Sequence, residues 1–329
     1  MQRARQNKIV EGDLLSKQET ELNLYYMTCS KYFEELNRKK FDYWFSAFCL
    51  ALGTKAGWVL EVGCGTGQVV NRLSNYNRNV VGVDISPIGI RMATRHEGAS
   101  AHFIIASAAN LPFRSNSFSS VGSNDFLEHT KKPETCLNEM VRVLRGGGKI
   151  IALAPNFLRV IGLSREYHWH MLGIKQRALN FFSLLRRVAM SMITPLNMQF
   201  EFMPARLDPD GRGGDVDAVC ITNPIDIKFF LKKLGIKIIE ESATPTYRQG
   251  LIKRLGEAPF IRSMSSSSFL VGIKVFQMNA RGKGVIEVPR QIEDKKHSIT
   301  SIGKVISILF IRARHVILHF GNISQEDDY

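Results

Sequence analysis

The chain has 329 residues, of which 44% are hydrophobic and 22% charged, and its formal net charge is +14. These proportions are those of a folded globular protein, so disorder throughout, a collagen-like repeat and a disulfide-stapled miniprotein are excluded. A charge of +14 points to an acidic partner, such as nucleic acid, an anionic lipid surface or a phosphorylated molecule, but net charge alone does not choose among them.

The five cysteines are scattered along the chain, without the CxxC spacing of a zinc site or a redox pair. An odd number of cysteines in a long chain is typical of reduced thiols in the cytosol. The first 15 residues are polar and charged, and no stretch approaches the roughly 18–20 apolar residues that span a bilayer. We therefore expect a cytoplasmic protein without a bound metal, attached at most peripherally to a membrane surface.

The N-terminal part of the chain carries apolar side chains at helical spacing. They are Leu22, Tyr25, Tyr26, Phe33 and Leu36, followed by Phe41, Trp44, Phe45, Phe48 and Leu52. We interpret this pattern as amphipathic helices that pack against the rest of the domain.

From Gly57 onward, short β-branched runs alternate with helical ones. The expected strands are Trp58–Val62, Val80–Asp84, Phe103–Ala106, Ser119–Ser123, Lys149–Ala154, Ile236–Glu240 and Phe269–Phe276. The expected helices are Gln68–Asn75, Pro87–His96, Pro133–Leu144 and Asp226–Leu234. Alternation of this kind predicts a mostly parallel sheet with helices on both faces. The glycines at 146–148 are expected to end the helix that precedes the fifth strand.

Residues 158–222 interrupt this rhythm close to the end of the fifth expected strand. Ligands of open α/β sheets bind beside the carboxyl ends of the strands, so an insertion here is well placed to act as a lid. The insertion should contain a helix with one apolar face, formed by Ala178, Phe181, Phe182, Leu185, Val188 and Met192.

The last part of the chain, 277–329, begins with a polar linker. It then shows a helical apolar stripe from Ile302 to Phe320, with basic and histidine side chains on the opposite side. Such a helix packs on its own domain, pairs with another subunit or lies in a membrane interface, and the sequence leaves these alternatives open.

The strongest motif runs from Glu61 to Gly67 and reads Glu-Val-Gly-Cys-Gly-Thr-Gly. It links an expected strand to an expected helix. Glycines let the backbone turn tightly and approach a ligand, and the free N–H groups at a helix start receive an anion. Asp84 ends the next strand, where its carboxylate is placed to accept hydrogen bonds from ribose hydroxyls.

Two ligand classes compete for this turn: a nicotinamide or flavin dinucleotide, and S-adenosyl-L-methionine. The usual dinucleotide fingerprint is G-x-G-x-x-G, whereas here an acidic residue, Glu61, ends the strand itself. A dinucleotide would bring its pyrophosphate against the turn, where that carboxylate repels it. S-adenosylmethionine instead offers an ammonium group near the strand end, a carboxylate to the turn and a ribose to Asp84. We therefore predict S-adenosyl-L-methionine as the cofactor.

The stretch from about Phe41 to Pro155 resembles a class I S-adenosylmethionine-dependent methyltransferase of the branch often called type 11. The resemblance rests on five motifs, which are Glu61–Gly67, Val83–Pro87, Ala108–Phe113 with Ser117–Phe118, Phe126–His129 and Arg142–Gly148. It implies an α/β fold with a doubly wound, mostly parallel seven-stranded sheet, the Rossmann-like methyltransferase fold, with a helical lid insertion and a C-terminal helical tail.

We divide the chain accordingly into five segments. They are an N-terminal helical segment over the cofactor site (1–52), the cofactor-binding core (53–157), a lid or acceptor-side insertion (158–222), the completion of the sheet (223–276), and a linker with an amphipathic C-terminal helix (277–329).

The resemblance also implies which residues hold the cofactor. Gly63, Gly65 and Gly67 would form the turn around the methionine part, with Cys64 and Thr66 between them, and Glu61 would face the ammonium group. Asp84 would bind the ribose, with Ile85 and Ser86 beside the adenine, Ala108 at the adenine edge, and Asn124 and Phe126 along the methionine side. Similar proteins usually have Asp where this chain has Ser107, so the bond to the adenine amino group is expected to be weaker.

Methyl transfer is an in-line displacement that requires no metal and no covalent enzyme intermediate, because its leaving group is neutral. A general base is needed only where the acceptor must lose a proton. The catalytic candidates are His129, Tyr167, His168 and His170.

We expect the acceptor to be a small or lipid-like molecule. The Asn/Asp-Pro-Pro-Tyr/Phe motif of base and amide methylation is absent, since Ser123-Asn124-Asp125-Phe126 stands in its place. Residues 157–276 carry 17 basic and 10 acidic side chains, the largest excess of any region, so the charge relates to the acceptor or to an anionic membrane surface. The alternatives are an RNA or tRNA methyltransferase and a non-catalytic S-adenosylmethionine-binding module; nucleic acid is the less favoured partner.

Overall fold

The structure is a computed structural model. It describes residues 17, 19–38, 43–53, 57–76, 79–96, 101–161, 173–208, 217–242, 263–264 and 268–275. Within these ranges no helix is both long and apolar enough to cross a bilayer. All five cysteines lie in this part, and none of them forms a disulfide bond there.

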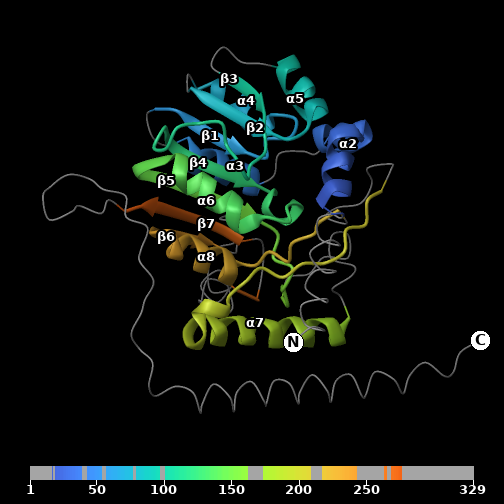
Figure 1. Cartoon of the computed structure of the whole chain (residues 1–329), viewed down its shortest axis with the longest axis vertical. Helices are drawn as coiled ribbons and strands as arrows, with labels where there is room; N and C mark the ends of the chain where they lie inside the picture. The colour runs from blue at the N-terminus through green and yellow to red at the C-terminus, as the bar shows by residue number, and fades with distance from the viewer. Residues whose placement is uncertain are drawn as a thin grey trace, which may run out of the picture.

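A seven-stranded sheet forms the centre of the molecule, in the order β3-β2-β1-β4-β5-β7-β6 (Figure 1). Its strands are β1 (Val59–Val62), β2 (Val80–Asp84), β3 (Ala101–Ile105), β4 (Phe118–Asn124), β5 (Leu144–Ala154), β6 (Ile236–Ser242) and β7 (Ser268–Lys274). The first five pair in parallel, and β7 runs antiparallel between β5 and β6. The predicted doubly wound, mostly parallel sheet is confirmed.

Helices cover both faces of the sheet. The α-helices are α2 (Ser30–Arg38), α3 (Tyr43–Leu52), α4 (Gln68–Ser74), α5 (Pro87–Ala93), α6 (Pro133–Val143), α7 (Ile174–Ile193) and α8 (Pro224–Lys233), and the 3₁₀ turns are η1 (Thr94–His96), η2 (Leu127–His129) and η4 (Pro195–Asn197). Apolar residues of α6 and α8 pack on one face of the sheet, and those of α3, α4 and α5 on the other. Burial on both faces explains why β1 and β2, which read Val-Leu-Glu-Val and Val-Val-Gly-Val-Asp, have few polar side chains.

The boundary between α6 and β5 differs from the prediction. The helix ends at Val143, and the chain enters the sheet at Leu144, which pairs with Phe118. The glycines at 146–148 therefore lie inside the strand and not after a helix end. Leu144 is fully buried, and the gain from burying it beside Phe118 favours extended backbone there.

The segment between β5 and α8 crosses over η2. Val219 and Cys220 donate backbone hydrogen bonds to the carbonyl of Glu128, at 2.8 and 2.9 Å, and Phe202 forms an isolated bridge with Cys220. The end of the insertion is thereby fixed beside the turn that follows β4. The division of the chain into five segments stays a prediction, and the C-terminal segment 277–329 lies outside the described residues.

The predicted apolar face of the insertion helix is wrong. In α7 the buried side chains are Asn180, Leu184 and Arg187, whereas Met192 is 78% exposed and Phe182 39% exposed. The reason is a set of polar partners that lies beneath the helix and attracts its polar side chains.

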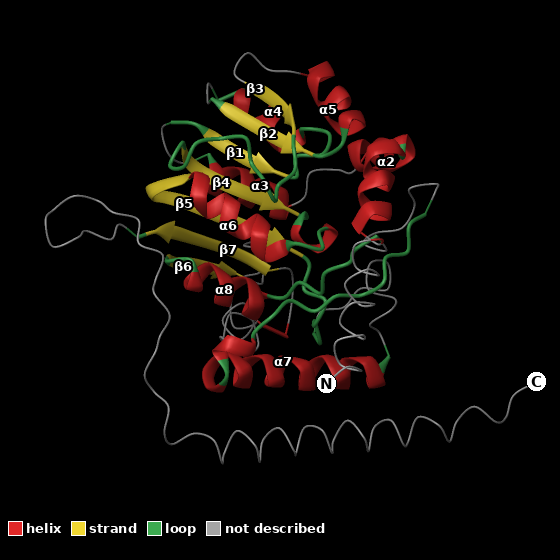
Figure 2. Cartoon of the chain, in the orientation of Figure 1, coloured by secondary structure: helices red, strands yellow, loops and turns green. Residues whose placement is uncertain are grey.

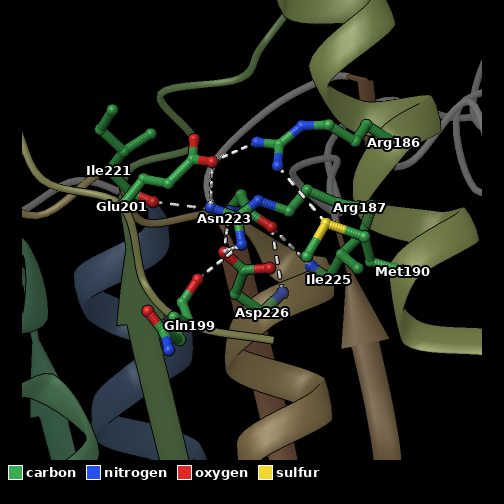
Figure 3. Close-up of polar contacts among 9 residues, drawn as sticks. All are labelled: Arg186, Arg187, Met190, Gln199, Glu201, Ile221, Asn223, Ile225 and Asp226. Carbon is green, nitrogen blue, oxygen red and sulfur yellow. Dashed lines mark hydrogen bonds and ion pairs between the residues drawn. The ribbon is translucent and has the colours of Figure 1, made fainter. Parts of the chain in front are cut away.

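These partners surround Arg187 (Figure 3). The Arg187 side chain is only 1% exposed. Its guanidinium lies 3.3 Å from Asp226 Oδ2 and 3.0 Å from Glu201 Oε1, and it donates a 2.6 Å hydrogen bond to the carbonyl of Gln199. Asp226 is fully buried and also accepts a bond from Asn223. Burial raises the pKa of Asp226 to about 6, against the opposing charge of Arg187. Together these contacts tie α7 to the first turn of α8.

Candidate functional site

A cavity of about 310 Å³ opens at the carboxyl ends of β1, β2 and β4. Figure 2 shows the arrowheads of these strands pointing to the side on which α2 lies. A volume of this size is in the range of small-molecule pockets. The cavity is lined by two groups of residues: the glycine-rich turn with the ends of β2 and β4, and the N-terminal helices with η2.

The turn after β1 is shaped by its glycines. Gly63 has a φ of 74°, and a Cβ placed on it would lie 2.4 Å from Phe126 Cδ2. Gly63 and Cys64 both donate backbone hydrogen bonds to the carbonyl of Val83. The turn is therefore packed between β2 and Phe126, and only glycine fits at position 63.

Asp84 connects this turn to the start of α5. Its Oδ2 accepts a 2.8 Å hydrogen bond from the backbone N–H of Gly65, and its Oδ1 accepts one of 2.8 Å from that of Ser86. Burial raises the pKa of Asp84, and these two hydrogen bonds oppose the rise. Each carboxylate oxygen has a second lone-pair direction, so the group can also accept bonds from a diol in the cavity.

Glu61 supplies a second carboxylate, deeper in the same cavity. It is 3% exposed, and its Oε2 has no hydrogen-bond partner among the described residues. Burial, followed by the nearby charge of Asp84, raises the pKa of Glu61 well above its ordinary value. A buried carboxylate with an unused oxygen favours a cation at its side, which fits the ammonium group of S-adenosylmethionine.

The structure brings most of the predicted cofactor residues together. The cavity is lined by Glu61, Gly63, Cys64, Gly65, Thr66, Asp84, Ile85, Ser107, Ala108, Asn124 and Phe126. Gly67 and Ser86 lie beside it: Gly67 is the N-cap of α4, with a φ of 73°, and Ser86 is fully buried and caps α5 through Gly89. Tyr167, His168 and His170 lie outside the described residues.

The N-terminal helices cover the cavity and add residues that the sequence did not single out as ligand-binding. Leu22, Tyr26, Tyr32, Phe33 and Leu36 all line it. The α2 helix is held over the turn by a 3.1 Å hydrogen bond from Gln68 Nε2 to the carbonyl of Leu36. The helical apolar spacing of these residues was visible in the sequence, but such spacing is equally typical of ordinary packing.

His129 lies at the end of the cavity formed by η2. Its Nδ1 is 3.0 Å from Tyr26 Oη and 3.3 Å from Asp217 Oδ2, and its Nε2 is 3.7 Å from Glu128 Oε1. Tyr26 donates a 2.7 Å hydrogen bond to Asp217. His129 thus meets side chains from the N-terminal helices and from the end of the insertion, neither of which the sequence had linked to it.

Comparisons with known proteins bear on this arrangement. Residues 60–152 match the family model described as a methyltransferase domain. This segment contains the glycine-rich turn, Asp84 and η2. The chain therefore contains a class I S-adenosylmethionine-dependent methyltransferase domain.

Among its curated relatives, this chain is 32% identical over 99 residues to the O-methyltransferase cnsE of Penicillium expansum, which is 28% of this chain and 36% of that protein. It is 30% identical over 161 residues to the uncharacterized methyltransferase YodH of Bacillus subtilis, which is 44% of this chain and 66% of that protein. It is 33% identical over 93 residues to a demethylmenaquinone methyltransferase of Renibacterium salmoninarum, which is 28% of this chain and 39% of that protein. The matches thus span between about a third and two thirds of these relatives.

Class membership and geometry agree on the cofactor. The unused oxygen of Glu61, the buried carboxylate of Asp84 and the tight turn at Gly63 are compatible with the ammonium, ribose and methionine parts of S-adenosylmethionine. The predicted cofactor of this methyltransferase is confirmed at the level of the family, and the role of each binding residue stays a prediction.

Proposed function

We propose that this methyltransferase transfers the methyl group of S-adenosylmethionine to a small or lipid-like organic acceptor. The observation that carries the proposal is that one continuous cavity joins the turn at Gly65 and Asp84 to the end lined by Tyr26 and His129. The N-terminal helices contribute aromatic and apolar side chains to this cavity, together with the polar Glu19 and Asn23, and such a mixed lining suits an organic molecule. Two of the curated relatives, an O-methyltransferase and a demethylmenaquinone methyltransferase, carry names that agree with such an acceptor.

S-adenosylmethionine, when bound, supplies an electrophilic methyl group whose leaving group is a neutral thioether. The protein's own contribution is to hold the acceptor in line with that methyl group and to keep water out. Glu61, Asp84 and the turn fix the cofactor end, while Phe33 and Leu36 cover the turn from the side of α2.

His129 is the general base of this proposal. Where the acceptor is a hydroxyl or an acidic carbon, its proton passes to the imidazole. The electron pair that this releases forms the new bond to the methyl carbon, and the pair of the old carbon–sulfur bond stays with sulfur. Glu128, whose Oε1 lies 3.7 Å from Nε2, stabilises the positive charge that the ring gains.

Association with an anionic membrane surface stays a prediction. The amphipathic helix expected between Ile302 and Phe320 lies outside the described residues, and α7 buries Arg187 instead of presenting it outward. Flotation of the full chain with anionic liposomes tests this prediction directly.

Replacing Asp84 by alanine is expected to weaken the binding of S-adenosylmethionine at least about tenfold. The substitution removes charge-assisted hydrogen bonds worth about 1.5–3 kcal/mol. It also leaves the backbone N–H of Gly65 without the carboxylate that accepts its hydrogen bond. Isothermal titration calorimetry with S-adenosylmethionine measures the change. The matched control is Glu240→Ala, an exposed acidic residue on β6 at the far edge of the sheet, which should bind like the wild type. Equal affinity of Asp84→Ala and wild type would show that the site is misassigned.

A further inference from the structure

The imidazole of His129 contacts two residues that come from distant segments of the chain. Tyr26 comes from the N-terminal helical stretch 19–28, and Asp217 from the end of the insertion. Both are buried, at 8% and 4% exposure, while the His129 side chain keeps 12% and lines the cavity. His129 and Tyr26 thus both border the cavity, and His129 is the more exposed of the two.

We propose that Tyr26 and Asp217 are positioning residues that set the tautomer of His129, through a chain of hydrogen bonds from Nδ1–H to Tyr26 Oη and from Tyr26 Oη–H to Asp217 Oδ2. This inference rests on the proposed function, because it explains how His129 becomes a base with its lone pair on Nε2.

The distances support this direction of hydrogen bonding, in which Nδ1 of His129 is the donor. Nδ1 lies 3.0 Å from Tyr26 Oη, within hydrogen-bond range, and 3.3 Å from Asp217 Oδ2, whereas Glu128 Oε1 lies 3.7 Å from Nε2, beyond that range. Among the residues that the structure describes, a proton on Nδ1 is therefore hydrogen-bonded, and a proton on Nε2 is not. The ring consequently keeps its free lone pair on Nε2.

Tyr26 is suited to the middle position because it retains its proton. Burial, followed by the charge of Asp217, raises its pKa well above the ordinary value. Its hydroxyl donates to the stronger acceptor, the carboxylate, at 2.7 Å, and this leaves its lone pairs for the imidazole N–H.

The two segments that carry Tyr26 and Asp217 also determine when these hydrogen bonds form. Val219, two residues after Asp217, packs with Leu22 and Phe33 of the N-terminal helices, and its N–H is bonded to the carbonyl of Glu128 beside His129. Both segments must therefore pack on η2 for His129 to carry its proton on Nδ1. Proton removal is thereby coupled to a covered cavity.

The test is the tautomer of His129, which needs no acceptor. Long-range proton–nitrogen spectra of the full chain, labelled with nitrogen-15 and saturated with S-adenosylhomocysteine, separate the two tautomers at alkaline pH. The His129→Asn variant identifies the signal. The wild type is expected to hold the proton on Nδ1, and a ring protonated on Nε2 would overturn the proposal.

The variant Asp217→Ala removes the acceptor of the Tyr26 hydroxyl, which then donates to Nδ1 at 3.0 Å. We expect the tautomer ratio to shift toward Nε2–H by about tenfold or more, the equivalent of one hydrogen bond. Asp217→Asn keeps an amide oxygen as acceptor and should retain the wild-type tautomer. An unchanged ratio in Asp217→Ala would contradict the proposal.

Calorimetry with S-adenosylhomocysteine on the same samples checks that each variant is folded. It also separates the two inferences. Failure of the wild type to bind S-adenosylhomocysteine would refute the proposed function, whereas binding with the wrong tautomer would refute only the role of Tyr26 and Asp217.

Discussion

Replacing Arg187 by methionine is expected to lower the free energy of unfolding by about 3–5 kcal/mol, because it leaves the carboxylate of Asp226 buried without its cation. Methionine fills much of the same space, so the loss reports mainly on charge. Denaturant unfolding followed by circular dichroism measures it. The matched control is Arg186→Met at the neighbouring position, where the side chain is 38% exposed and pairs with Glu201. That variant should lose no more than about 1 kcal/mol.

The loss of unfolding free energy caused by Arg187→Met should grow as the pH rises. Burial already raises the pKa of Asp226 to about 6, and removal of Arg187 raises it further. The native state then keeps a proton that the unfolded chain has released, so stability falls with increasing pH. The difference from wild type is expected to be larger at about pH 8 than at about pH 5. The double variant Arg187→Met, Asp226→Asn should be more stable than Arg187→Met at the higher pH. Equal stability of wild type and Arg187→Met at both pH values would refute this account of the cluster.

The second large effect is expected at His129. The variant His129→Asn should lower kcat by about 10²–10⁴-fold, the usual contribution of a general base. Its affinity for S-adenosylmethionine should stay within about twofold of wild type, because the ring lies outside the turn that holds the cofactor. The assay is the initial rate of labelled methyl transfer into the extract fraction that the wild type labels.

The control for this variant is His102→Asn, an exposed position on β3 where the ring contacts Trp58. It should show wild-type rates. An undiminished kcat in His129→Asn would mean that the acceptor reacts without losing a proton to this residue.

The cofactor half of the site could be predicted from the sequence because it is local. One strand, the turn from Glu61 to Gly67 and the next strand ending at Asp84 are close along the chain, and each has a residue pattern of its own. The hydrogen bond from Gly65 to Asp84 spans only 19 positions. Short-range patterns of this kind specify both the fold and the ligand class.

The half of the site that we propose for the acceptor could not be predicted, because its residues meet only in the folded chain. Tyr26 is 103 positions from His129 and 191 from Asp217. No local pattern links them, and each is a common residue type. From the sequence alone, the aromatic residues around Tyr26 therefore indicate no more than ordinary helix packing.

The face of α7 was predicted wrongly for a related reason. Amphipathic analysis places charged side chains in solvent, whereas Arg187 is buried because Asp226, 39 positions later, lies beneath it. A buried ion pair depends on both partners, and neither one indicates it alone.

Transfer of a labelled methyl group tests the central claim most directly. The full chain is incubated with methyl-labelled S-adenosylmethionine and a cell extract separated into small molecules, lipids, RNA and protein, with Asp84→Ala in parallel. We predict that the wild type labels the small-molecule or lipid fraction, and that Asp84→Ala labels it much more slowly at limiting cofactor. Label in none of the fractions, or in RNA or protein alone, would contradict the account.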